Sequence, residues 1–414
     1  MTGSVMVLSA ASGAGHLRAA DALAAAFGAR GVPARHVEVL KYTNPIFKRI
    51  YSDLYVDLVN KQPEILGWLY NALDRPWQFQ KRRLALDRLN TVSLVRLLKK
   101  EKPEIVICTH FLPAEILVDL RKKKVLDTPI GVVVTDLDAH AMWLYKGVDW
   151  YFVAREETRA HLAVLGIPEE TIHVTGIPID PVFGVDRPKR AARIDLGLDP
   201  DRMTILVSAG GFGVGPVETL VKAVQEVRRP VQVVVICGRN AQLERKLNGL
   251  SGMKHPMKIV GFTREMDVWM AASDLLVGKA GGLTSTEALA RGLVLVVVNP
   301  IPGQEERNSD HFLEEGVAIR CNNLRDRRDH GLRTSWGDGR CRMRAVPAMG
   351  LTAPQNALGG FPQGPPAGLQ EDREADSRTG PVRHLCLSRV SRTAPGRMVC
   401  SGWPLPDLDL PILP

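Results

Sequence analysis

An alternation of short apolar runs with helical stretches occurs twice along this chain, and it constrains the fold more than any other feature. In the first array the apolar runs, which resemble strands buried on both faces, lie at residues 5–8, 104–108, 130–135 and 150–153. A proline-bounded link at residues 175–181 follows, and further runs lie at residues 204–208, 231–237, 258–260, 275–277 and 294–298. Consecutive βα units form parallel sheets covered by helices. We therefore expect an α/β protein with two Rossmann-like domains that face a cleft, over residues 1–178 and 179–324.

The composition is that of a soluble globular protein. The 414 residues suffice for two domains with cores of their own, and 45% of them are hydrophobic and 24% charged. No apolar run approaches the ~18 residues of a membrane-spanning helix. The first apolar run has no Lys or Arg before it, which argues against a signal peptide. The six cysteines lack metal-type spacing, so we expect a cytoplasmic protein without a metal site.

The stretch "LSAASGAGHLRAADAL" joins the first strand to the first helix through a glycine turn. His16 directly follows Gly13-x-Gly15, at the carboxyl end of the strand, where open α/β sheets bind their ligands. A dinucleotide-binding turn is one alternative, because Glu38 lies near the end of the next apolar run. Arg18, however, stands where the third glycine of that fingerprint belongs.

A second glycine turn, "SAGGFGVGPVETL", follows the first strand of the second array. Its four glycines within six positions are Gly210, Gly211, Gly213 and Gly215. Such a turn exposes backbone N–H groups next to a helix N-terminus, which favours anions. The pattern is typical of a diphosphate site, although a tight strand–helix turn uses glycine as well.

A third junction, "KAGGLTSTEALARG", also joins a strand to a helix. We expect the helix to be capped by one of its hydroxyl side chains, Thr284, Ser285 or Thr286. Glu287 would then lie in the first turn, either as a capping residue or, beside a nucleotide, as an acceptor for ribose hydroxyls. In "NPIPGQEERN", Gln304 and Glu305 follow the last strand, and an adjacent amide and carboxylate suit sugar hydroxyls.

Seven motifs in sequence order carry a resemblance to a known family. They are "SGAGHLRAADAL", "TDLDAHAMWLYKGVDWYFVAREE", "TGIPIDPVF", "GGFGVGP", "ICGRN", "GFTREMDVWMAASDLLVGKAGGLTSTEALARG" and "PIPGQEERN". Over about residues 4–324 the chain resembles the monogalactosyldiacylglycerol synthase and processive diacylglycerol glucosyltransferase family. These are membrane-associated glycosyltransferases of the GT-B fold. The resemblance implies transfer of a hexose from UDP-glucose or UDP-galactose to diacylglycerol, with inversion at the anomeric carbon.

The resemblance also implies which residues of the second domain bind the UDP-hexose. They are Gly210, Gly211, Gly213 and Gly215 for the diphosphate, Gly261, Phe262 and Thr263 for the uracil, Glu287 for the ribose, Gln304 and Glu305 for the hexose, and Gly281, Gly282 and Thr284 at the junction that carries Glu287. Lys279, the last lysine of the chain, would neutralise phosphate or be a solvated loop charge.

The resemblance gives His16 a role as well. It would be the general base that takes the proton from the diacylglycerol hydroxyl, since an imidazole is largely neutral at cytoplasmic pH. Asp136, in "VTDLDAH", would orient a partner or share the base role, unless it only caps a helix, and His140 is a weaker candidate. The implied chemistry requires neither a metal nor a cofactor.

Aromatic residues gather in one part of the first domain. Eight of the chain's 23 aromatic residues lie between Tyr42 and Phe79, and Lys81-Arg82-Arg83 follows them. Together with the basic runs at 99–102 and 121–124, they favour an anionic membrane surface on the cytoplasmic side. A core-facing helix and solvated helix ends would explain the same residues. The net charge of +9 is not spread as in a nucleic-acid-binding protein, so no nucleic acid is expected.

Two other functions fit the motifs. A UDP-sugar epimerase shares the fold, and a protein that binds a UDP-sugar without turnover is the second alternative. The latter arises because the resemblance stops near Leu324.

Residues 325–414 differ sharply in composition from the rest. They contain thirteen arginines, no lysine and no tyrosine, and 22 of these 90 residues are proline or glycine. Such a composition is close to that of disordered segments. We expect a segment translated out of frame or, alternatively, a disordered interaction tail.

Overall fold

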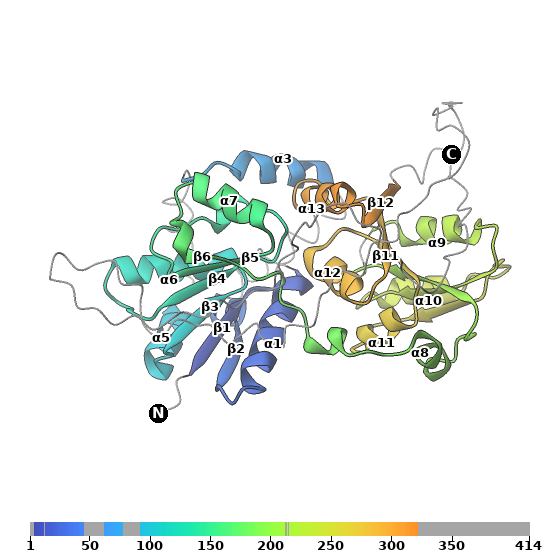
Figure 1. The fold of residues 1–414 in the computed structure, drawn as a ribbon, viewed down its shortest axis with the longest axis horizontal. Helices are drawn as coiled ribbons and strands as arrows, with labels where there is room; N and C mark the ends of the chain where they lie inside the picture. Colours follow the sequence, from blue (N-terminus) through green and yellow to red (C-terminus); the bar gives the residue numbers. More distant parts are fainter. Residues whose placement is uncertain are drawn as a thin grey trace, which may run out of the picture.

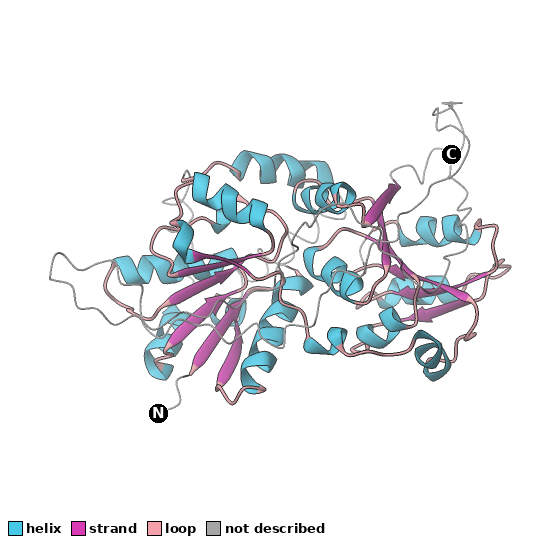
Figure 2. Ribbon diagram, viewed as in Figure 1, coloured by secondary structure: helices cyan, strands magenta, loops and turns pink. Residues whose placement is uncertain are grey.

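The computed structural model describes residues 4–11, 13–44, 62–77, 92–211, 213 and 215–321. Within them the strands form two separate parallel sheets of six strands each, side by side in Figures 1 and 2. Strands β1 to β6 build the first sheet and β7 to β12 the second. The expected two-sheet α/β class is therefore confirmed. The expected tail at 325–414 lies outside the described residues.

The first sheet has the strand order β2-β1-β3-β4-β5-β6. Its strands are β1 (Val5–Ser9), β2 (Ala34–Glu38), β3 (Ile105–Cys108), β4 (Ile130–Val133), β5 (Trp150–Val153) and β6 (Ile172–Val174). The described helices of this part are α1 (Ala14–Gly28), α3 (Pro63–Leu73), α5 (Val92–Glu101), α6 (Phe111–Lys122) and α7 (Glu156–Val164). Single 3₁₀ turns are η1 (Val39–Tyr42), η2 (Ala141–Trp143) and η3 (Glu169–Thr171).

The second sheet has the order β12-β11-β10-β7-β8-β9. Its strands are β7 (Met203–Ser208), β8 (Val231–Ile236), β9 (Met257–Val260), β10 (Leu275–Gly278), β11 (Val294–Val298) and β12 (Ala318–Cys321). Its helices are η4 (Pro181–Gly184), α8 (Lys189–Asp195), α9 (Val217–Gln225), α10 (Ala241–Asn248), α11 (Met266–Ala271), α12 (Gly282–Ala290) and α13 (Gln304–Glu314).

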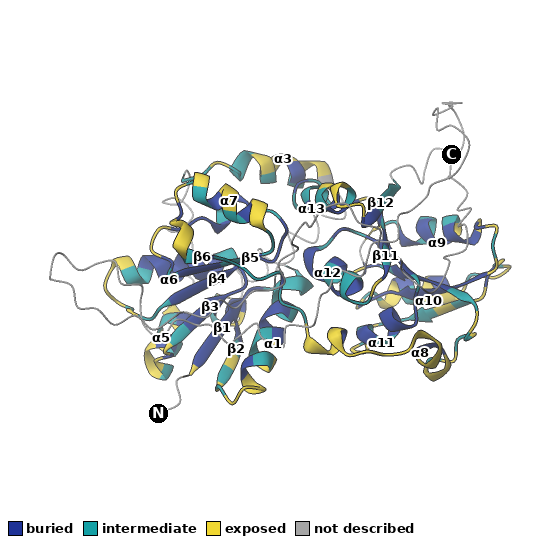
Figure 3. Cartoon of the chain, in the orientation of Figure 1, coloured by how far each residue is buried: buried dark blue, intermediate teal, exposed yellow. Residues whose placement is uncertain are grey.

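The central strands of both sheets are buried, as the continuous apolar runs predict, whereas the edge strands such as β9 are only partly buried. β4 and β8 are buried along their whole length, and Figure 3 shows the sheets as the dark centre of each half. The strand β4 ends at Val133, two residues before the expected end, so Thr135 and Asp136 belong to the loop after the strand. From this loop the Thr135 hydroxyl contacts His16 of the first half, whereas the Asp136 carboxylate contacts the second half.

The strand orders locate the ligand-binding edge. In each sheet the chain reverses its direction of winding next to the first strand, between β1 and β3 and between β7 and β10. Ligands of open α/β sheets bind at such switch points, beyond the carboxyl ends of the strands. The three glycine junctions follow β1, β7 and β10. All three therefore lie at switch points.

Apolar side chains of both halves share one cluster. Ala19 of α1 and Leu137, after β4, pack with Leu283 of α12 and Phe312 of α13. The two halves thus bury apolar surface against each other in addition to their own cores, which favours the closed arrangement seen in Figure 1.

Candidate active site between the two sheets

His16 lies in the first turn of α1, which begins at Ala14 after an extended Gly13. Its Nδ1 is 2.9 Å from the backbone oxygen of Thr109, which follows β3, and 2.9 Å from the hydroxyl of Thr135, which follows β4. The rings of His110 and Trp143 flank it, at centroid distances of 4.6 and 6.2 Å. Three strand ends of the first sheet therefore position this one imidazole.

These contacts define the protonation of His16. A carbonyl oxygen only accepts, so Nδ1 carries the hydrogen that bonds to Thr109. Burial lowers the pKa of His16 to about 4, and the bond to Thr109 opposes that shift. The ring is therefore neutral at pH 7 with Nε2 unprotonated, as a proton acceptor requires.

Asp136 is buried, but it does not bond to His16. Its Oδ1 accepts from Nε2 of Gln304 at 2.5 Å and from Nδ2 of Asn308 at 3.4 Å, both on α13 of the second half. Burial raises the pKa of Asp136 to about 6, whereas these two bonds lower it. The structure thus brings Asp136 to a predicted hexose residue rather than to the predicted base.

His140 has both ring nitrogens engaged. Its Nδ1 accepts from the backbone N–H of Met142 at 3.1 Å, and its Nε2 donates to the backbone oxygen of Tyr70 at 2.8 Å. The side chain therefore holds η2 and α3 together and has no nitrogen left for a substrate proton.

Glu287 lies in α12 with 1% of its side chain exposed. The helix begins at Gly282 with Gly281 as its N-cap, so Thr284 lies inside the helix rather than at its cap, and Glu287 is in the second turn. The expected hydroxyl cap is wrong because the helix already begins at the second glycine of the pair. Thr286, the third candidate, donates instead to the backbone oxygen of Gly282.

The two carboxylate oxygens of Glu287 have different surroundings. Oε1 forms an ion pair with the guanidinium of Arg18, on α1 of the first half. Oε2 is buried and has no hydrogen-bond partner in the described part of the chain. Burial raises the pKa of Glu287 to about 7, while Arg18 lowers it. An unsatisfied buried acceptor is rare and calls for an explanation such as a ligand donor.

The glycines after β7 allow neighbouring segments to pack closely against two sides of this turn. A Cβ on Gly211 would lie 2.7 Å from Cβ of Ala14 in α1. A Cβ on Gly213, whose φ is +65°, would lie 2.2 Å from the backbone oxygen of Cys237 after β8. Packing thus explains glycine at these two positions without a ligand, and Gly210 and Gly215 also have positive φ values.

Lys279 lies beside this turn, because a Cβ on Gly215 would be 3.4 Å from its Cε. Burial lowers the pKa of Lys279, while the charge of Glu305 raises it. Glu305 accepts from the backbone N–H of Ile301 at 2.7 Å, and burial raises its pKa. The charges of the lysine and the carboxylate therefore act on each other next to the glycine turn, and Lys279 is partly buried rather than fully solvated.

Gly261, Phe262 and Thr263 follow β9. Phe262 is 55% exposed, with the guanidinium of Arg239 over its ring at 5.0 Å. The N–H of Arg239 donates to the backbone oxygen of Gly211 at 3.3 Å, which links this loop to the glycine turn. Thr263 accepts through its hydroxyl from the N–H of Glu265 at 3.0 Å.

Sequence reasoning assigned no site role to Arg18 and Asn308, which both join the halves. Asn308 is fully buried, accepts from the N–H of Leu137 at 2.9 Å and donates to the backbone oxygen of Ala280 at 3.1 Å. Glu38, in contrast, accepts from the backbone N–H groups of Leu40 and Ala11. It thus links the start of η1 to the loop after β1.

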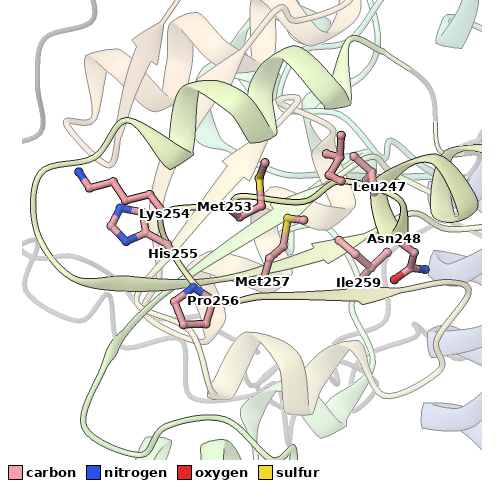
Figure 4. Close-up of a pocket in the computed structure, with 9 residues that line it drawn as sticks. Leu247, Asn248, Met253, Lys254, His255, Pro256, Met257 and Ile259 are labelled. Carbon is pink, nitrogen blue, oxygen red and sulfur yellow. The ribbon is translucent and has the colours of Figure 1, made fainter.

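The cavity in Figure 4 lies elsewhere. It measures about 420 Å³, and the figure shows Met253 and Met257 between Lys254–His255 and Leu247–Asn248. Because Met257 begins β9, this cavity is at the amino ends of the strands, away from the glycine junctions. Among the described residues no helix is long and apolar enough to cross a membrane. In the same ranges, no three His, Cys, Asp or Glu side chains are grouped to hold a metal ion.

Two doubly wound parallel sheets with glycine junctions facing one crevice define the GT-B class. Residues 16–179 match the family model of monogalactosyldiacylglycerol (MGDG) synthase, and residues 204–323 match that of the glycosyltransferase family 28 C-terminal domain. The processive diacylglycerol beta-glucosyltransferase of Staphylococcus aureus (strain Newman) is 31% identical over 320 residues, 76% of this chain and 80% of the relative. The chain belongs to this family of glycosyltransferases.

Two solved structures are also similar. MurG of Acinetobacter baumannii has a TM-score of 0.46 and 15% identity over 77% of this chain and 86% of that chain. MnaA of S. aureus, in a co-structure with UDP, has a TM-score of 0.49 and 14% identity over 77% and 83% of the two chains.

Proposed function

We propose that this protein is an inverting glycosyltransferase that moves a hexose from UDP-glucose or UDP-galactose to diacylglycerol. The observation that carries the proposal is the state of His16, a neutral imidazole with Nδ1–H bonded to the Thr109 carbonyl and Nε2 unprotonated at a switch point. The name of the S. aureus relative supports diacylglycerol as the acceptor and glucose as the sugar.

In the proposed step, Nε2 of His16 takes the proton of the diacylglycerol hydroxyl as its oxygen attacks the anomeric carbon. The bond from that carbon to the β-phosphate oxygen breaks, and UDP leaves with both bonding electrons. Attack from the face opposite the leaving group turns an α-linked donor into a β-glycolipid. The residues offered for this step supply a base and no metal or cofactor.

The donor would lie along the second sheet. The glycine turn after β7 and Lys279 would face the diphosphate, since backbone N–H groups and a cation attract phosphate. Oε2 of Glu287 would accept a ribose hydroxyl, which would satisfy its missing partner. Gln304 and Glu305 would contact the hexose, and Phe262 with its neighbours would contact the uracil.

We also propose peripheral binding to a membrane on its cytoplasmic face, through α3. Ile65, Trp68 and Leu69 of this helix are 48%, 71% and 38% exposed, whereas Tyr70 packs on the loop before α13. An exposed Trp between aliphatic residues suits the membrane interface. Figure 1 shows α3 beside α13 of the second half.

The positions of the basic runs support membrane binding less strongly than the sequence pattern predicts. Lys99 and Lys100 end α5, and Arg121 and Lys122 end α6, at the amino ends of the strands, away from the crevice. Arg121 is also paired with Asp149 at 2.7 Å. Residues 81–83 lie outside the described residues.

The test is transfer from labelled UDP-glucose or UDP-galactose to vesicles that contain diacylglycerol, with lipid products separated by chromatography. A labelled glycolipid and released UDP are expected. An epimerase would convert the sugar of the UDP-sugar without a lipid product. A protein that only binds the donor would release no UDP, and either of these results would overturn the proposal.

A further inference from the structure

Arg18 and Glu287 come from opposite halves of the molecule. Arg18 lies in α1, two residues after His16, and its side chain is 38% exposed. Glu287 lies in α12 and is almost fully buried. The only charged group of the first half that reaches this carboxylate in the described part of the chain is the guanidinium of Arg18.

The same two helices approach each other at their glycines. A Cβ on Gly15 would be 3.7 Å from Cβ of Leu283, and a Cβ on Gly282 would be 2.2 Å from the backbone oxygen of Thr135. Thr135 also contacts His16. The first turn of α1 is therefore in contact with α12, and the first turn of α12 lies against the loop after β4.

From this geometry we infer that Arg18 completes the nucleotide site across the crevice, by fixing Oε1 of Glu287 so that Oε2 accepts a ribose hydroxyl. The inference rests on the proposed function, in which Glu287 binds the ribose. It makes Arg18 a positioning residue, which acts through Glu287 and links occupancy of the ribose site to the helix that carries His16.

The charges around Glu287 make UDP affinity depend on pH in a way that tests the role of Arg18. Arg18 on α1 favours its ionised form, while burial and Asp180, just before η4, favour the neutral form. Removal of Arg18 raises the pKa of Glu287 further. Hydrogen bonds to a charged acceptor are stronger than those to a neutral one. UDP affinity should therefore begin to fall at a higher pH when Arg18 is absent.

The test is calorimetric titration of the full chain with UDP between pH 6 and 8.5. Arg18→Ala is expected to weaken UDP binding about 10-fold at pH 7, a typical loss for a charge-assisted contact. The pH at which affinity falls should also move upward, and Arg18→Lys should restore that pH. Arg35→Ala is the matched control, because Arg35 is an exposed arginine of β2 paired with Glu101. The titration of the UDP phosphate is common to all variants.

A double-mutant cycle distinguishes failure of this inference from failure of the proposed function. In a Glu287→Gln background, Arg18→Ala should have no further effect on UDP affinity, because the two side chains act as one unit. An equal loss in both backgrounds, or an Arg18→Ala protein that binds UDP like the Arg35→Ala control, would overturn the inference. If Glu287→Gln alone leaves UDP affinity unchanged, the ribose role of Glu287 in the proposed function fails, and the inference fails with it.

Discussion

The side-chain amide of Gln304 donates a hydrogen bond of 2.5 Å to Oδ1 of Asp136. Gln304 is the first residue of α13 in the second half, and Asp136 follows β4 of the first half. The bond therefore joins the two halves. The side chain proposed to contact the hexose is thus oriented by a carboxylate of the other domain.

Gln304→Ala should raise the KM for the UDP-hexose about 10-fold and leave the Kd for UDP unchanged, because UDP lacks the sugar that the amide would contact. Steady-state kinetics and calorimetry with UDP separate the two quantities. Gln242→Ala, at an exposed position of α10, serves as the control. A parallel loss of UDP affinity would contradict the assignment of Gln304 to the hexose.

His16→Ala should lower kcat by about 10²–10⁴, the range for a lost general base, with little change in UDP affinity. His161→Ala, at an exposed position of α7, should retain full turnover. Because the pKa of His16 is about 4, its neutral form predominates at all pH values well above 4. Near-normal turnover of the alanine variant would show that another group takes the proton.

Gly282→Ala should reduce transfer at least 10-fold, because the added methyl would meet the Thr135 carbonyl oxygen and push the two halves apart. Gly28→Ala is the matched control, since a Cβ there meets nothing within 4 Å. Small-angle scattering measures the separation of the halves. An active variant with unchanged scattering would show that the structure accommodates the methyl group beside Thr135 without separating the halves.

Glu287→Gln should reduce the pH dependence of the protein's stability. Burial raises the pKa of Glu287 from 4.5 to about 7. Between pH 4.5 and 7, the folded protein therefore keeps a proton on Glu287 that the unfolded chain has lost. Wild-type stability therefore decreases as pH rises from 4.5 to 7, and the glutamine variant lacks this decrease. The difference should reach on the order of 2–3 kcal/mol above pH 7. Urea unfolding at pH 5 and pH 8 measures it, and equal differences at both values would refute the assignment.

Trp68→Ser should weaken binding to vesicles, because Trp68 is the most exposed large apolar side chain of α3. Val164→Ser, on α7, is the control, since that valine is 85% exposed but lies outside α3. Sedimentation with anionic vesicles at low and high salt provides the measurement. A loss of pelleting in high salt alone, with no effect of Trp68→Ser, would indicate docking by basic residues instead.

Local pattern predicted the framework of this protein well. The runs at 150–153 and 294–298 are the strands β5 and β11 with the predicted bounds, and the other predicted strands differ by one or two residues at an end. Continuous apolar runs bounded by glycine turns leave few alternatives to parallel strands. The position of His16 after β1 followed from the same pattern.

Pairings between the halves could not be predicted from local pattern. Asp136 was expected to orient a partner or share the base role, unless it only capped a helix, and in the structure it bonds to Gln304 and Asn308. The capping hydroxyl expected near Glu287 also failed, since the helix begins earlier than the hydroxyl residues. In both cases a neighbour distant in sequence determined what the side chain does.

The sequence by itself determined the two βα arrays, their glycine junctions and the residue types at the strand ends, because periodicity and turn chemistry act over a few neighbouring residues. Only the tertiary structure decided that Arg18 meets Glu287, that Asp136 meets Gln304, and that His16 donates to Thr109. These contacts join residues 93 to 269 positions apart. They depend on how the two sheets dock, and docking is set by the summed packing of both surfaces rather than by any short stretch of the chain.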